Sequence, residues 1–188
     1  MKKTLLTLSL GFVLQAQAAT SVRFSSTITS SSLSGLKNDI SRAANRLQEN
    51  DERVIIIDLS SGGGDLQASL RFVGEVYSLA SRLGVQIDTR VTSSCESACT
   101  ILYTAGQNRL ASRSAQFGFH SPKIESRIPR GMNRGDLLDR FRQDWLNAIG
   151  RVDGGLAYQL EDRGFLLRDD MQYISASRAR GGYVTHIQ

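Results

Sequence analysis

The chain has 188 residues, of which 40% are hydrophobic and 22% are charged, with a formal net charge of +5 at pH 7. This length is enough for one domain with a single core, and the weak positive charge gives little reason to expect a charged partner. The densest basic stretch, 123–142, is interpreted as solvated surface, so no nucleic-acid partner is predicted.

The N-terminus has the pattern of a secretory signal peptide. Two lysines precede an apolar run at 5–14, and Ala16-Gln17-Ala18 is a small-x-small cleavage signal. The apolar run is too short to span a bilayer comfortably, and no later stretch approaches the roughly 20 apolar residues of a membrane helix. We therefore expect a signal peptide at 1–18 and a single soluble domain at 19–188. The domain is expected in the periplasm, without stable membrane insertion after cleavage.

The first half of this domain alternates predicted strands and helices. An opening strand is expected near 22–28, followed by a helix with Ser34 as its N-cap and apolar residues every three or four positions. The run 54–59 is apolar on both faces, as in a strand buried within a parallel sheet. Three successive glycines at 62–64 then predict a tight turn with close backbone approach.

A second helix is predicted before Gly84, which should end it. Its predicted apolar face comprises Leu66, Leu70, Val73, Tyr77, Ala80 and Leu83. A strand at 85–91 follows, then a third helix from about Ser97 towards 105. Strands and helices in this order predict an α/β fold with parallel pairing.

The remaining elements are shorter or more helical. Short strands are expected at 109–111 and 115–119. A helix between Leu137 and Ile149 has a broad apolar face that serves either the core or an interface. A short helix at 156–162 and a final strand at 183–185 complete the prediction.

Ser97 occupies the predicted start of the third helix, where a serine often serves only as an N-cap. The same position favours a nucleophile, because the N–H of the next residue, Ala98, points towards an oxyanion that forms there. A second donor is expected from the N–H of Gly63, although glycine turns also bind phosphates or no ligand. The sequence thus offers a candidate nucleophile and two candidate oxyanion donors.

His120 follows the predicted strand at 115–119 and is one of two histidines; the other, His186, lies near the C-terminus. An isolated histidine is often a structural residue held by hydrogen bonds. His120, however, ends a strand that runs back from the Ser97 helix, and its ordinary pKa of about 6.5 suits a general base at neutral pH. We therefore predict that His120 takes the proton of Ser97.

Cys95 and Cys99 bracket Ser97. Two cysteines of an exported chain favour a disulfide, and this spacing can bring the two Cα atoms within the roughly 4.4 to 6.8 Å that a disulfide accepts. A redox role stays open, although the spacing is not Cys-x-x-Cys. Two cysteines and two scattered histidines give no second ligand pair for zinc, so neither a metal nor another cofactor is expected.

Three different short motifs follow one another along the chain. Ser60-Ser61-Gly62-Gly63 follows a hydrophobic strand, Thr104-Ala105-Gly106 ends the helix that begins at Ser97, and Gly118-Phe119-His120-Ser121-Pro122 comes third. They are similar to motifs of the Clp protease proteolytic subunit. That family has Ser-Pro-Gly-Gly, a nucleophilic Ser followed at the same distance by Ala-Gly, and a His before Gln-Pro. The resemblance covers about residues 22–188 and is sharpest at 54–122.

The resemblance implies a ClpP/crotonase-like α/β fold of repeated β-β-α units with a mostly parallel sheet. It implies that Ser97 and His120 are catalytic and that the N–H groups of Gly63 and Ala98 form an oxyanion hole. It also implies a peptide or protein substrate and a homo-oligomer. Within the superfamily, the chain resembles exported bacterial ClpP-like proteins, which share the Cys-x-Ser-Ala-Cys arrangement.

Three residues depart from the family pattern. Ser61 replaces the turn proline, Glu96 precedes the nucleophile where a small residue is usual, and Met171 aligns with the triad Asp. The carboxylate that orients the histidine is then expected from Asp170 or Asp169, or is absent. We favour Asp170.

Two functions follow from this pattern. The first is an exported serine hydrolase, specifically a peptidase, and the second is an inactive binding or assembly protein of the cell envelope that keeps the fold. Crotonase-type acyl-CoA chemistry is disfavoured by the signal peptide. A lysine base, as in signal-peptide peptidases, is disfavoured because no Lys lies between Lys37 and Lys123.

Overall fold

The computed structural model of the protein describes residues 20–124 and 128–188, so the predicted signal peptide at 1–18 lies outside the described residues. The chain forms a five-stranded sheet in the order β1-β2-β3-β5-β8 and a three-stranded sheet in the order β4-β6-β7. All pairs in the larger sheet are parallel. Its strands are β1 (Thr20–Phe24), β2 (Val54–Leu59), β3 (Gln86–Val91), β5 (Arg109–Ala111) and β8 (His186–Ile187). The predicted α/β architecture with a mainly parallel sheet is confirmed.

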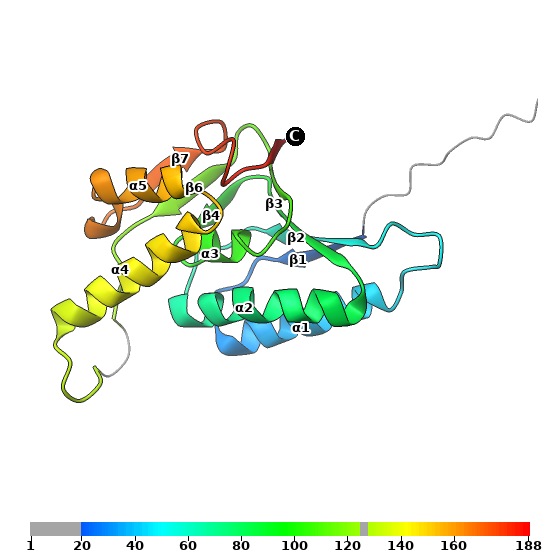
Figure 1. The fold of residues 1–188 in the computed structure, drawn as a ribbon, viewed down its shortest axis with the longest axis horizontal. Coiled ribbons are helices and arrows are strands. Elements are labelled where there is room, and N and C mark those ends of the chain that lie inside the picture. Colours follow the sequence, from blue (N-terminus) through cyan, green and yellow to red (C-terminus); the bar gives the residue numbers. More distant parts are fainter. Residues whose placement is uncertain (1–19, 125–127) are drawn as a thin grey trace, which may run out of the picture.

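Helices α1 (Ser30–Ala44) and α2 (Leu66–Leu83) lie side by side along the larger sheet (Figure 1). Helix α1 begins earlier than predicted, because Thr29 rather than Ser34 is its N-cap. Thr29 and Ser32 exchange side-chain and backbone hydrogen bonds in a capping box, which fixes the start of the helix. Helix α2 ends as predicted, at Gly84 in the left-handed conformation.

The buried face of α2 agrees with the predicted one in part, because Ala80 is buried and Leu66, Leu70, Val73 and Leu83 pack against the core. Its core residues include Phe72, Val76 and Leu79, whereas Tyr77, predicted on the apolar face, is 48% exposed. Apolar residues cover a wide arc of this helix, so their spacing alone does not determine which of them pack most deeply against the sheet.

The smaller sheet contains two strands that the sequence did not predict. Strand β6 (Gln116–Phe119) was expected, but β4 (Ser94–Glu96), which pairs with it in parallel, and β7 (Gln172–Ser175), which pairs with it antiparallel, were not. Helix α3 (Cys99–Tyr103) follows β4 and is shorter than predicted. Behind it, the rings of Tyr103, Phe117 and Tyr183 pack with centroids 4.8 to 5.0 Å apart.

The C-terminal part begins with α4 (Arg134–Gly150), which extends away from the main body, and α5 (Gly154–Asp162) packs against it (Figure 1). A short 3-10 helix, η1 (Phe165–Leu167), leads to β7. The final strand is β8, beside β5, rather than the predicted 183–185, because Tyr183 and Val184 turn into the core. No helix within the described residues is both long and apolar enough to cross a membrane.

Candidate active site

Ser97 lies in the tight connection between β4 and α3. Its φ of 53° is the only positive φ of a non-glycine residue among those that the structure describes. Its N–H donates to the carbonyl of Gly118 on β6 at 2.8 Å, and its carbonyl accepts from the N–H and hydroxyl of Thr100 at 2.9 and 2.7 Å. A strained residue held from both sides in this way is typical of a functional site.

The glycine turn between β2 and α2 packs directly against Ser97. A Cβ built on Gly63 would lie 2.5 Å from Ser97 Cβ and 3.0 Å from Ser97 Oγ. Gly63 also has a φ of +100°, which side chains rarely adopt. The predicted close backbone approach therefore occurs at Gly63, and its partner is the candidate nucleophile.

His120 immediately follows β6 and reaches the same point. Its Nε2 lies 2.8 Å from Ser97 Oγ. The ring packs edge-on against Trp145 of α4, with centroids 6.1 Å apart. Trp145 is itself fixed, because its Nε1 donates to Thr100 Oγ1 at 3.0 Å. The structure thus brings together the two residues that the sequence proposed as nucleophile and base.

Burial of the His120 ring lowers its pKa below the ordinary value of a histidine. An interaction with the backbone of Ser121 opposes this shift and raises the pKa. Lys123 lowers the pKa further, whereas the carboxylates of Asp169 and Glu96 raise it. The ring is therefore neutral at neutral pH and can accept a proton from Ser97.

The second ring nitrogen of His120, Nδ1, is buried and has no hydrogen-bond partner among the described residues. The structure does not bring Asp170 to it. The Asp170 side chain is exposed and accepts a hydrogen bond from Gln172 Nε2 at 2.6 Å. Asp169, the alternative, is also exposed.

The register of β6 and β7 explains this placement. Phe119 pairs with Gln172 across the two antiparallel strands, so the next position towards His120 belongs to Met171. The sulfur of Met171 lies 2.7 Å from the position of a Cβ built on Gly118, on the face of the sheet that His120 shares. The register thus places Met171 opposite His120, at the position where an orienting carboxylate was expected.

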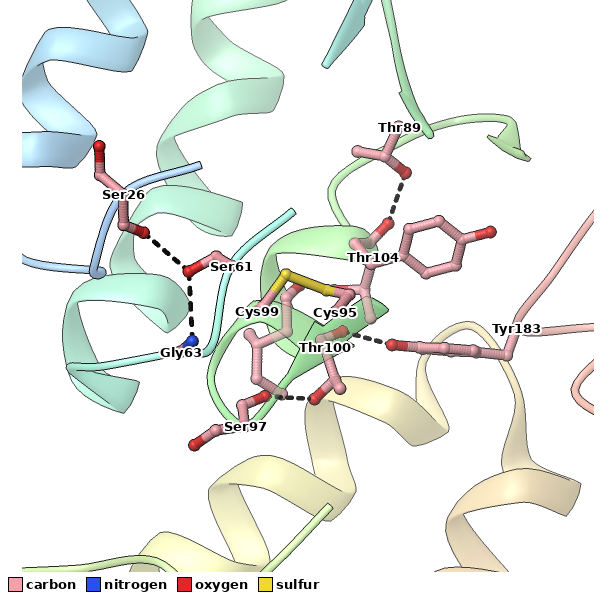
Figure 2. The surroundings of a disulfide bond; sticks show 12 residues. Ser26, Ser61, Gly63, Thr89, Cys95, Ser97, Cys99, Thr100, Thr104 and Tyr183 are labelled. Atoms are coloured by element: carbon pink, nitrogen blue, oxygen red, sulfur yellow. Dashed lines mark hydrogen bonds between the residues drawn. A yellow bond between two sulfur atoms is a disulfide. The ribbon is translucent and has the colours of Figure 1, made fainter. Parts of the chain in front are cut away.

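The two candidate oxyanion donors flank Ser97, and one already has an acceptor. The N–H of Gly63 donates to Ser61 Oγ at 3.2 Å, and that hydroxyl donates to the carbonyl of Ser26 at 2.7 Å (Figure 2). Ala98, directly after Ser97, is the N-cap of α3, so the helix begins two residues later than predicted.

Cys95 and Cys99 form a disulfide, as predicted, with their Cα atoms 5.3 Å apart. Both are fully buried and lie on either side of the Ser97 turn (Figure 2). The bond joins β4 to α3 and so ties together the two elements that carry Ser97. Among residues 20–124 and 128–188, no group of three or more His, Cys, Asp or Glu side chains is placed to hold a metal ion.

Comparison with known proteins bears on the fold. No protein-family model and no curated protein sequence matches the chain. Among solved structures, a mutant of ClpP1 from Listeria monocytogenes resembles it with a TM-score of 0.62 and 20% sequence identity, over 89% of this chain and 90% of the other. The chain has the ClpP fold.

Some residues of this ClpP-fold site could not be found from the sequence. Trp145 and Thr100 position the histidine and the serine, but they lie 45 residues apart and share no motif. Glu96 was noticed only as a departure from the family pattern, and its contact with Tyr173 was not foreseen. Both pairs depend on tertiary packing, which residue spacing does not encode.

Proposed function

We propose that this protein is an exported serine peptidase. The observation that carries the proposal is the 2.8 Å contact between Ser97 Oγ and His120 Nε2. The positive φ of Ser97 and the close approach of Gly63 support it. A serine that only capped a helix would need none of these features.

In this mechanism Ser97 Oγ attacks the carbonyl carbon of a peptide bond while its proton passes to His120 Nε2. The N–H groups of Gly63 and Ala98 stabilise the oxyanion, each with a typical effect of about 10² to 10³ on the rate. For Gly63 to contribute, its N–H turns from Ser61 Oγ towards the substrate oxygen. His120 then protonates the leaving amine, and it accepts a proton from the water that releases the acyl group from Ser97.

A peptide is the substrate class that suits this site. Strand β4, which leads into Ser97, is an edge strand of the smaller sheet. An extended peptide can lie along the part of this edge that the hydrogen bond from Glu96 to Ser61 leaves free, and present a carbonyl to the nucleophile. Export is supported by the signal pattern at 1–18 and by the Cys95–Cys99 disulfide, which suits an oxidising compartment such as the periplasm.

A fluorophosphonate probe tests the proposal, because it reacts covalently with activated serines. We expect the purified protein to be labelled at Ser97, and labelling to be lost in Ser97→Ala and in His120→Ala. Ser93→Ala, which changes an exposed serine next to β4, is the matched control and should label normally. Peptide mapping of the labelled protein by mass spectrometry identifies the modified residue.

The second candidate is a binding or assembly protein without turnover. The observation that favours it is the buried Nδ1 of His120 without an acceptor among the described residues, together with Met171 rather than a carboxylate at the position opposite His120. Absence of labelling in the folded protein would support this candidate and contradict the first.

We also propose a homo-oligomer. Helix α4 extends from the body, and its apolar residues divide between the core and partly exposed positions. The buried ones include Trp145 and Ile149, whereas Leu138, Phe141 and Leu146 are only partly covered. Light scattering of the purified protein measures its mass in solution, and the mass of a single chain would contradict this proposal.

A further inference from the structure

Glu96 directly precedes Ser97 and lies on the same face of the smaller sheet as His120. A Cβ built on Gly118, two residues before His120, would lie 3.0 Å from Glu96 Cγ. The Glu96 side chain thus fills the space above Gly118, which only a glycine leaves open. Its acidic group is consequently held beside the candidate nucleophile and base.

The carboxylate is held by a hydrogen bond at one of its oxygens, and the other lies near the glycine turn. Oε1 accepts a hydrogen bond from the hydroxyl of Tyr173 on β7 at 2.9 Å. Oε2 lies 3.9 Å from the position of a Cβ built on Gly62, the neighbour of the candidate oxyanion donor Gly63. The backbone of Glu96 is attached to the same turn, since its N–H donates to the carbonyl of Ser61 at 3.0 Å.

Among the residues that the structure describes, this carboxylate has no positively charged partner. Within residues 20–124 and 128–188, no Lys, Arg or His forms an ion pair with Glu96. Glu96 is partly buried, so water screens its charge less than that of a fully exposed group. A cation that enters the site beside Ser97 therefore meets an oriented, uncompensated negative charge.

We propose that Glu96 is a specificity-determining residue that selects peptides with a lysine or arginine on the acyl side of the scissile bond. This inference rests on the proposed function. An ammonium or guanidinium group gains a charge-assisted hydrogen bond to the carboxylate, whereas an acidic side chain is repelled. Tyr173 is a positioning residue, because its hydroxyl holds Oε1.

Three peptides that differ only in the residue before the scissile bond test this specificity. The residue is lysine, norleucine or glutamate, and kcat/KM is measured for the wild type, Glu96→Gln and Glu96→Lys. We expect the wild type to prefer lysine over norleucine by about tenfold, which corresponds to about 1.4 kcal/mol. Glu96→Gln should bring this ratio close to one, and Glu96→Lys should favour glutamate. Glu49→Gln, which removes an exposed carboxylate beyond α1, is the control and should keep the wild-type ratio.

The ratio separates specificity from other roles of Glu96. If Glu96 acted through the charge of His120 or through folding, Glu96→Gln would slow all three peptides by the same factor and leave the ratio unchanged. That result would overturn the inference. A wild type that cleaves lysine and norleucine peptides equally would overturn it as well, while the proposed function stands.

A binding measurement keeps the inference testable even without turnover. Calorimetry with Ser97→Ala compares the affinity of the lysine and norleucine peptides, which this variant cannot cleave. Tighter binding of the lysine peptide, lost in the double variant Ser97→Ala/Glu96→Gln, would support the subsite. Equal affinities would overturn it. Failure of fluorophosphonate labelling in the wild type would instead count against the proposed function.

Discussion

The two sides of His120 are built very differently. On the side of Nε2, Ser97 is held by the disulfide between Cys95 and Cys99, by backbone hydrogen bonds and by the close approach of Gly63. Nδ1, in contrast, is buried without a hydrogen-bond partner among the described residues, and the register of β6 and β7 places Met171, directly before β7, opposite His120.

This difference shows which half of the chemistry the fold supports most strongly. Attack by Ser97 needs a positioned hydroxyl and a neutral histidine within reach, and both are present. Orientation of the imidazole and stabilisation of its charged form normally come from a carboxylate at Nδ1. Here the ring is oriented instead by packing on Trp145. We therefore expect a dyad whose nucleophile is well placed and whose base is weakly supported.

The largest change in fluorophosphonate labelling should come from Gly63→Ala, which disrupts the packing around Ser97. The new Cβ would lie 2.5 Å from Ser97 Cβ and 2.9 Å from the carbonyl oxygen of Glu96, at a φ of +100°. We expect labelling to fall by about 10³ or more, because Ser97 and an oxyanion donor both move. The melting temperature should fall as well.

Gly62→Ala is the matched control for this substitution. It lies in the same turn, but its nearest contact is 3.9 Å away and its φ is not positive. Labelling of Gly62→Ala should remain close to that of the wild type. Normal labelling of Gly63→Ala would show that the close approach of the glycine turn does not matter for reactivity.

The next largest change in labelling should come from Met171→Asp, which adds a carboxylate opposite His120. A carboxylate at this position can accept the Nδ1 proton of His120, and we expect labelling to rise by about 10- to 100-fold. Burial lowers the pKa of His120 in the wild type, so its labelling should rise with pH through a midpoint below the ordinary value. The added negative charge favours the protonated ring, so this midpoint should move upwards in the variant. The pH dependence of the labelling rate measures both changes.

Asp170→Asn distinguishes the added carboxylate from the native one. Because Asp170 is exposed and bonded to Gln172, its removal should change labelling less than twofold. A loss as large as that in His120→Ala would show that Asp170 reaches His120 in solution. An unchanged pH midpoint in Met171→Asp would show that the side chain at position 171 does not face Nδ1.

The parts of the fold that the sequence predicted are those with dense local signals. The strand at 54–59, the glycine turn and the end of α2 at Gly84 were recognised from apolar runs and from glycine. Strands β4 and β7 were missed because they form through pairing with β6, which the local sequence does not show. The start of α1 was misplaced because several neighbouring Ser and Thr residues compete as caps, and only Thr29 completes a capping box.

The candidate site also contains residues that the sequence predicted and one position that it did not. Ser97, His120 and the two cysteines were proposed from residue type and position, and the structure brings them together. The placement of Asp170 could not be predicted, because a shift of one residue along β7 moves a side chain to the other face of the sheet. Only the register of β6 and β7 shows that Met171 takes that place.

A smaller change in labelling should come from removing the Cys95–Cys99 disulfide with the double variant Cys95→Ala/Cys99→Ala. The loop that this disulfide closes is short, so the free energy of unfolding should fall by about 2 kcal/mol or less. Ser97, however, has a strained backbone, and such strain of about 1 to 3 kcal/mol persists only where the surroundings enforce it. Without the bond the turn can relax, and labelling should fall by about tenfold while the protein stays folded. Labelling rates and chemical denaturation, measured on the same samples, separate the two effects. If labelling decreased only in proportion to the unfolded fraction, the disulfide would serve stability alone, and the Ser97 turn would be held by Gly63 and β6 without it.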